Sequence, residues 1–346
     1  MASSHLRLAF ALLSTIPACA SADFKSVAHA YPDGRAAPYE IFFSGEITTS
    51  TTRQFLDLVL SHKIEKATVY FDSIGGDLIS GMELGEQIRK AGFNTAIGKM
   101  VSGAAPALGK CQSSCVLSYV GGYFRFAEPG SNIGIHRFYR RTAGEQDLDE
   151  GQILSAAITS YLTRMGTDPK LFERMVQVER GRMQTLSLQD AAKLKVFNNG
   201  VLPAEWKIEG KSGQVYLRGT QESWLGTGKI LMSCNGGGNG VSLSALYDAG
   251  ANTDRIAKES VSYSLRLDSL FLPVPAGDLR RRPAVQGEYL LATYSPTPPV
   301  VQSIEQARKI GFAFHPKTKN EFFGFMIDAD QERDTINSFI QHCRTK

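Results

Sequence analysis

Short apolar runs alternate with amphipathic segments in the first third of the chain. Residues 39–47 (YEIFFSGEI) and 66–77 (KATVYFDSIGGD) are rich in β-branched and aromatic residues and run into glycine turns, which predicts strands. Residues 48–64 and 78–92 space their apolar side chains as helices do, and residues 93–99 predict a third strand. This order restricts the fold to α/β architecture with parallel strands and crossover helices.

The following segment departs from this regular alternation. Residues 101–110 (VSGAAPALGK) combine small residues with glycine and proline, which predicts an inserted loop. We expect a helix to start within CQSSC at 111–115, followed by one strand over 123–138 and by helices over 151–166 and 169–178.

The pattern changes again near residue 204. A short helix within 186–200 closes the first domain, residues 23–203. Short alternating runs separated by glycine and proline then predict a mainly β second domain, residues 204–346, which ends in a helix over 330–343.

Residues 1–22 have the pattern of a secretory signal peptide. Arg7 is the only lysine or arginine before a short apolar core, and two overlapping small-residue sites, ACA and ASA, follow it. A lipoprotein box around Cys19 is the alternative, but the proline before it fits that pattern poorly. We predict a periplasmic or secreted protein whose mature chain begins at or near Ser21 or Asp23.

Composition excludes several classes of protein. Apolar residues make up 42% and charged residues 21% of the 346-residue chain, as in folded globular proteins. The net charge of +4 is modest, and the basic clusters at 137–141 and 280–282 form no aromatic–basic stripe, so we expect no nucleic-acid partner. No apolar run is long enough for an integral membrane span.

Four cysteines remain if Cys19 leaves with the signal peptide: Cys111, Cys115, Cys234 and Cys343. An even number in an oxidising compartment predicts disulfides. A zinc site is the alternative, but neither a CxxC pair nor a nearby histidine supports it, and we expect no metal. The economical pairing joins Cys111 to Cys115 locally and Cys234 to Cys343 across the second domain.

Two adjacent serines, Ser113 and Ser114, lie between the first two of these cysteines. A serine hydroxyl becomes a nucleophile only when a general base within hydrogen-bond reach removes its proton. In the mature first domain, His29 and His62 lie in segments with a surface pattern, whereas His136 ends an apolar strand. His136 is therefore the candidate base, and a strand-end histidine bonded to backbone is the structural alternative.

The first domain resembles a known family in the order of four motifs. They are FSGEI at 43–47, the SIGGD segment at 69–89, the CQSSC-to-GIHRF segment at 111–138 and TLSLQDAAKL at 185–194. In this order they are similar to the Clp-type serine peptidases of the crotonase-like superfamily, in particular to exported members with a Cys-x-Ser-x-Cys signature. The resemblance covers about residues 39–200. It implies a repeated β-β-α superhelix.

The resemblance also assigns roles to residues. It aligns Ser113 with the nucleophile and His136 with the base. It makes the backbone N–H groups of Ser114 and Gly76 the donors of an oxyanion hole, which suits a free N–H at a helix start and a glycine that lets the backbone approach a substrate. A plain tight turn is the alternative interpretation of the two glycines.

The third member of a catalytic triad is missing from its expected place. The resemblance puts an aspartate three residues before the LS of the last motif, where this chain has Met183. Three alternatives stay open: Glu179 or Asp168 supplies the acid, the site is a Ser–His dyad, or catalysis is lost.

These patterns lead to two main hypotheses of function. The first is an exported serine hydrolase of the peptidase class that acts on a peptide or protein without a cofactor. The alternative is a non-catalytic binding or assembly module that retains the fold, and the resemblance leaves room for a homo-oligomer. A third hypothesis is acyl-CoA chemistry. The export signal disfavours it, because CoA thioesters are intracellular.

Overall fold

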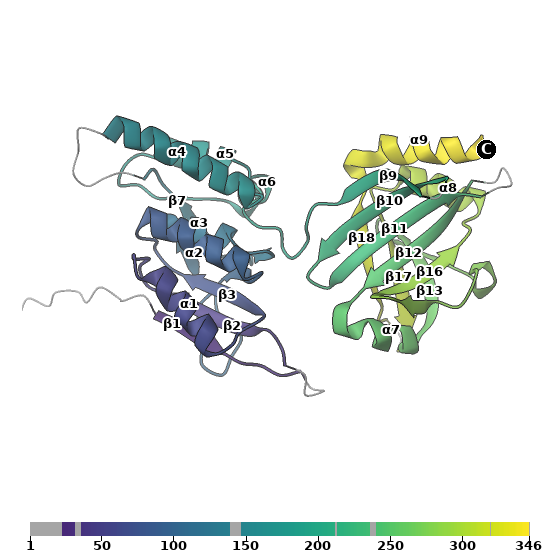
Figure 1. Cartoon of the computed structure of the whole chain (residues 1–346), viewed down its shortest axis with the longest axis horizontal. Helices are drawn as coiled ribbons and strands as arrows, with labels where there is room; N and C mark the ends of the chain where they lie inside the picture. The colour runs from purple at the N-terminus through teal and green to yellow at the C-terminus, as the bar shows by residue number, and fades with distance from the viewer. Residues whose placement is uncertain are drawn as a thin grey trace, which may run out of the picture. The chain divides into compact units, whose positions relative to one another are not determined.

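The computed structural model describes residues 23–31, 36–138, 147–211, 213–235, 240–318 and 320–345. The predicted signal peptide lies outside the described residues. The chain forms two compact units that divide between Phe197 and Asn198 (Figure 1), a few residues before the boundary that we placed after residue 203.

The first unit is a mixed α/β structure built on a five-stranded sheet of order β1-β2-β3-β4-β6. β2, β3, β4 and β6 run parallel, and β1 is antiparallel to β2. Helices α1 and α2 connect consecutive parallel strands, so the predicted alternation is confirmed. The strands are β1 (Asp23–Val27), β2 (Tyr39–Ser44), β3 (Ala67–Asp72), β4 (Asn94–Ile97) and β6 (Arg125–Phe126).

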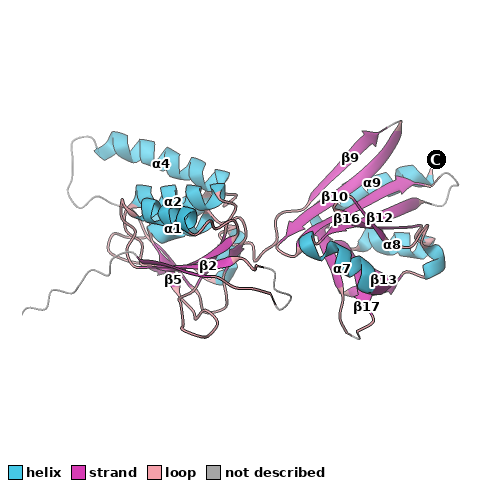
Figure 2. Cartoon of the chain, turned by 60° about the horizontal axis from the view of Figure 1, so that its bottom comes forward, coloured by secondary structure: helices cyan, strands magenta, loops and turns pink. Residues whose placement is uncertain are grey.

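Helices α1, α2 and α4 lie on one side of this sheet (Figure 2). Side chains of β3 alternate between the core and the opposite face, as strand geometry requires. Val69 and Phe71 are fully buried in a core shared with Phe55 of α1 and Leu84 of α2. The helices are α1 (Thr51–Ser61), α2 (Leu78–Lys90), α3 (Ser114–Val120), α4 (Asp147–Arg164), α5 (Lys170–Gln177) and α6 (Leu188–Lys193).

Helices α2 and α3 approach each other through two glycines. A Cβ on Gly81 would lie 2.7 Å from the Ser114 carbonyl oxygen, and a Cβ on Gly85 would lie 2.7 Å from that of Leu117. Four residues apart, these glycines share one face of α2. The contact fixes the start of α3 against α2, and the candidate serine lies at that start.

A separate three-stranded sheet of order β5-β7-β8 borders α3. β5 (Lys110–Gln112) is parallel to β7 (Asn132–Ile135), and β8 (Gln184–Thr185) is antiparallel to β7.

The single strand predicted over 123–138 is wrong. This segment contains β6 and β7, which belong to different sheets. Pro129 lacks a backbone donor, and Gly130 adopts a φ of 93° that ends the extended backbone between the two strands.

The second unit is mainly β, as predicted. One antiparallel sheet has the order β15-β16-β12-β11-β10-β9, and another has the order β14-β13-β17-β18. The strands of the first sheet are β9 (Glu205–Lys211), β10 (Gln214–Ser223), β11 (Gly226–Cys234), β12 (Val241–Asp248), β15 (Ala284–Gln286) and β16 (Tyr289–Tyr294). Those of the second are β13 (Ser260–Leu267), β14 (Leu270–Pro273), β17 (Lys309–Pro316) and β18 (Phe323–Asp328).

The predicted terminal helix is confirmed as α9 (Arg333–Arg344). The structure adds α7 (Thr253–Glu259) and α8 (Pro298–Gln306), which the strand-like pattern did not predict. Within the described residues, no helix is both long enough and apolar enough to cross a membrane.

The core of the second unit combines a cluster of aromatic rings with a disulfide. Five rings from the two sheets pack against one another: Tyr247, Tyr263, Phe312, Phe314 and Phe325. Cys234 at the end of β11 is bonded to Cys343 of α9, and Cys111 in the first unit is bonded to Cys115. The longer bridge fastens the last helix to the sheet.

Candidate active site

Two neighbouring parallel strands carry the candidate serine and histidine at their carboxyl ends. β5 pairs with β7 so that Gln112 lies opposite Gly134, and the N–H of Ser113 donates a 2.8 Å hydrogen bond to the Gly134 carbonyl. Ser113 directly follows β5, and His136 directly follows β7. Because the carboxyl ends of parallel strands meet at one edge, the two side chains emerge side by side.

The backbone of Ser113 is held in a rare conformation. Its φ of 57° and ψ of −130° lie outside the regions that residues with a Cβ normally occupy. Such a conformation costs about 1–3 kcal/mol and persists only where the surroundings enforce it. Ser113 is the N-cap residue of α3, yet its side chain makes no capping hydrogen bond. The hydroxyl faces His136 instead.

The Ser113 Oγ lies 2.6 Å from Nε2 of His136. The other ring nitrogen, Nδ1, lies 2.8 Å from the carbonyl oxygen of Arg137. A carbonyl can only accept, so the Nδ1 atom carries the proton and donates it to Arg137. In the neutral ring, Nε2 then has a free lone pair and accepts the hydrogen bond of the Ser113 hydroxyl. This is the tautomer that a general base requires.

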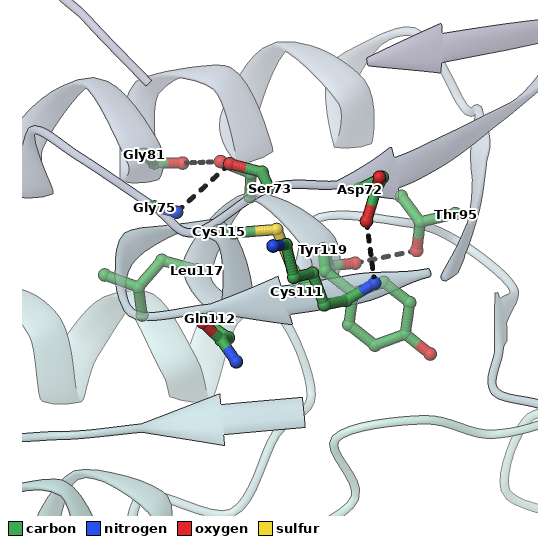
Figure 3. The surroundings of a disulfide bond; sticks show 12 residues. Asp72, Ser73, Gly75, Gly81, Thr95, Cys111, Gln112, Cys115, Leu117 and Tyr119 are labelled. Atoms are coloured by element: carbon green, nitrogen blue, oxygen red, sulfur yellow. Dashed lines mark hydrogen bonds between the residues drawn. A yellow bond between two sulfur atoms is a disulfide. The ribbon is translucent and has the colours of Figure 1, made fainter. Parts of the chain in front are cut away.

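The glycine turn after β3 lies directly against Ser113. Gly75 has a φ of 91°, and a Cβ there would lie 2.6 Å from Cβ of Ser113 and 3.0 Å from the Ser114 nitrogen. Ser73 supports the turn, because its hydroxyl donates to the Gly45 carbonyl. The same oxygen accepts the Gly75 N–H at 3.1 Å (Figure 3). A side chain at position 75 would separate the turn from the serine.

The two candidate oxyanion-hole donors, the N–H groups of Ser114 and Gly76, belong to the two segments that meet here. Ser114 is the first residue of α3, where N–H groups have no acceptor within the helix and form the positive end of its dipole. The turn pairs with Ile47 through the Gly75 carbonyl and the Asp77 N–H. Gly76 lies between these two groups and has a φ of 150°.

A disulfide encloses the serine turn. Cys111 in β5 and Cys115 in α3 are bonded, and both are fully buried (Figure 3). Ser113 lies midway between them in the sequence. The covalent link joins the strand before Ser113 to the helix after it. It therefore restrains the direction in which the hydroxyl points.

Two arginines bind the opposite end of α3. Arg125 donates to the carbonyl of Val120, and Arg89 donates to those of Gly121 and Gly122. Burial lowers the pKa of Arg125 to about 10, so the residue stays charged at neutral pH. Cations at the carboxyl end of a helix complement its dipole, which fixes the helix that begins at the candidate site.

Met183 lies near the end of β7 that precedes His136. β7 and β8 pair Gly134 with Thr185 and Ile135 with Gln184, and Met183 comes directly before β8. The sulfur of Met183 lies where it would be 2.9 Å from a Cβ on Gly134, so the side chain covers that glycine. The position expected to hold an acid therefore presents a thioether.

The two alternative acids make other contacts. Asp168 accepts the Lys170 N–H at 2.9 Å at the start of α5. The Glu179 carboxylate is 3.2 Å from Arg182 in an exposed ion pair. Both carboxylates are thus engaged with groups outside the Ser113–His136 pair.

Two further histidines among the described residues of the first unit are exposed. His29 pairs with Glu40 at 2.9 Å, and the Nδ1 of His62 lies 3.1 Å from the Leu58 carbonyl at the end of α1. The group that the sequence did not reveal is the carbonyl of Arg137. A backbone acceptor leaves no signal in residue types, so only the geometry identifies it.

Over the described part of the chain, no group of three or more His, Cys, Asp or Glu side chains could hold a metal ion. No protein-family model matches this chain, and no curated protein matches it significantly.

Proposed function

We propose that this protein is an exported serine hydrolase of the peptidase class, and that its first unit has the Clp-type crotonase-like fold. The observation that carries the proposal is the 2.6 Å contact between Ser113 Oγ and His136 Nε2, made by a serine with strained backbone. The motif order supports the fold assignment. The signal-peptide pattern and the two disulfides are compatible with export.

In the proposed reaction, Ser113 Oγ attacks the carbonyl carbon of a peptide bond while its proton moves to Nε2 of His136. The N–H groups of Ser114 and Gly76 stabilise the negative charge that develops on the carbonyl oxygen. His136 then protonates the leaving amine, which leaves an acyl group on Ser113. Water, deprotonated by the same histidine, releases the acid product and regenerates the serine.

Because Met183 occupies the position expected for the acid, we expect a low rate of peptide hydrolysis. In serine peptidases, loss of the acid that orients the histidine reduces kcat by about 10⁴-fold, whereas the remaining groups still accelerate hydrolysis about 10³–10⁴-fold over water. Turnover should therefore be slow compared with a complete triad.

Met183 also favours the second candidate function, a non-catalytic binding or assembly module. In that case the Ser113–His136 contact is a structural hydrogen bond, and Ser113→Ala leaves binding unchanged.

A fluorophosphonate probe separates the two candidates. We expect it to label folded wild-type protein, but not Ser113→Ala or His136→Gln. Ser114→Ala is the matched control, because it removes the neighbouring hydroxyl and keeps its backbone N–H. Labelling that survives Ser113→Ala and is abolished by Ser114→Ala contradicts the assignment. An unlabelled wild-type protein supports the binding module.

A further inference from the structure

We propose that Arg137 is a positioning residue that performs the task of the aspartate in Ser–His–Asp sites. Its carbonyl holds the Nδ1–H of His136, and its guanidinium holds that carbonyl in place. The effect on rate rests on the proposed function, whereas the hydrogen-bond arrangement can be tested without any activity.

A base histidine needs an orienting acceptor at Nδ1. That acceptor selects the tautomer with a lone pair on Nε2 and stops the ring from turning away from the serine. In this chain the Arg137 carbonyl lies 2.8 Å from Nδ1, within hydrogen-bonding distance.

The side chain of Arg137 fastens this carbonyl to a helix. Its Nε donates a 2.8 Å hydrogen bond to the carbonyl of Val176, in the last turn of α5. Carbonyls in a last turn lack intrahelical donors and carry the negative end of the dipole, so a guanidinium binds them well. α5 is itself anchored by Leu171 and Met175, which are buried in the core. The backbone after β7 is thus tied to a fixed element.

The residue at the expected position of the acid, Met183, fits this division of tasks. Met183 packs over Gly134 and has no oxygen to accept from Nδ1. A neutral carbonyl selects the same tautomer as a carboxylate, but it stabilises the imidazolium less when the ring takes the serine proton. Arg137 would therefore supply orientation and little charge stabilisation.

Nitrogen-15 NMR of the imidazole rings tests the arrangement directly, with His136→Gln used to assign the signal among six histidines. We expect His136 to carry its proton on Nδ1 in wild-type protein and in Ser113→Ala. Arg137→Ala should give mixed tautomers, and Arg137→Lys, which keeps a donor for Val176, should restore the single one. Arg182→Ala is the matched control, because it removes an exposed arginine paired with Glu179. A proton on Nε2 in the wild type, or no change in Arg137→Ala, overturns the proposal.

The rate of fluorophosphonate labelling tests the consequence. Arg137→Ala should slow Ser113-dependent labelling about tenfold or more, because small misplacements of reacting groups cost up to 10²-fold. Adding Met183→Asp to that variant should recover the rate, since position 183 is where the resemblance puts the acid that accepts from Nδ1. A wild-type rate in Arg137→Ala, or no recovery in the double variant, contradicts the positioning role. Arg137-dependent tautomers in a protein that is never labelled would refute the hydrolase and retain the positioning role.

Discussion

The two units of this protein are stabilised in different ways. The second unit is a regular antiparallel structure with an aromatic core, and its disulfide joins residues 109 positions apart. The first unit keeps parallel strands, and its disulfide spans only four positions around one strained serine. The long bridge restrains the fold of a whole unit, whereas the short one restrains the direction of one side chain. We therefore expect the catalytic chemistry in the first unit, at Ser113, where the regular backbone is interrupted.

Removing each disulfide should show the largest difference between the units. Chain-entropy estimates give about 5 kcal/mol for the bridge that closes 109 residues and about 2 kcal/mol for the one that closes four. We expect Cys234→Ala/Cys343→Ala to lower the free energy of unfolding of the second unit by about the larger amount.

Tryptophan fluorescence makes this measurement specific, because both tryptophans, Trp206 and Trp224, lie in the second unit. Cys111→Ala/Cys115→Ala is the matched control and should leave the fluorescence transition in denaturant unchanged while it slows labelling of Ser113. A fluorescence transition that shifts as far in this control as in Cys234→Ala/Cys343→Ala would contradict the comparison.

The glycine turn beside Ser113 is the next most sensitive feature. A Cβ on Gly76, where φ is 150°, would lie 2.1 Å from the Ile47 carbonyl oxygen. Gly76→Ala should therefore destabilise the first unit by about 3 kcal/mol or more. Gly92→Ala is the control, because its φ of 69° is also positive but no atom lies within 4 Å of the new Cβ. It should cost about 1 kcal/mol, from backbone strain alone.

Thermal unfolding followed by far-ultraviolet circular dichroism measures both variants. Equal losses at the two positions would mean that the turn does not pack as closely as the structure indicates.

Much of this organisation was predictable from local patterns. The alternation of β2, α1, β3, α2 and β4 follows from hydrophobic periodicity, and α9 from its amphipathic spacing. We did not predict the separation of β6 from β7, because residues 123–138 have the apolar pattern of one extended strand. Pro129 and Gly130 interrupt that strand. Helices α7 and α8 are short, so few turns are available to establish a period.

The candidate site was also predictable only in part. Residue types identified Ser113, His136 and the departure at Met183, because side-chain chemistry and motif spacing are visible in a sequence. The φ of Ser113 and the carbonyl of Arg137 were not predictable, since both depend on backbone geometry imposed by distant contacts.

The smallest expected effect concerns the strain at Ser113. Glycine adopts its φ of 57° and ψ of −130° without steric cost, so Ser113→Gly should raise the stability of the first unit by about 1 kcal/mol while it removes the hydroxyl. Ser113→Ala removes the same hydroxyl and keeps the strained Cβ, so it should give no such gain. Denaturant unfolding of the two variants decides the point, and equal stabilities would argue against stored strain.

A crystal structure of the protein after reaction with a fluorophosphonate tests the central claim most directly. We predict a phosphorus atom bonded to Ser113 Oγ, with its oxygen hydrogen-bonded to the backbone N–H groups of Ser114 and Gly76. His136 should remain beside the adduct, with its Nδ1 on the Arg137 carbonyl. An adduct on another residue, or a phosphonyl oxygen that points away from both N–H groups, would contradict the account.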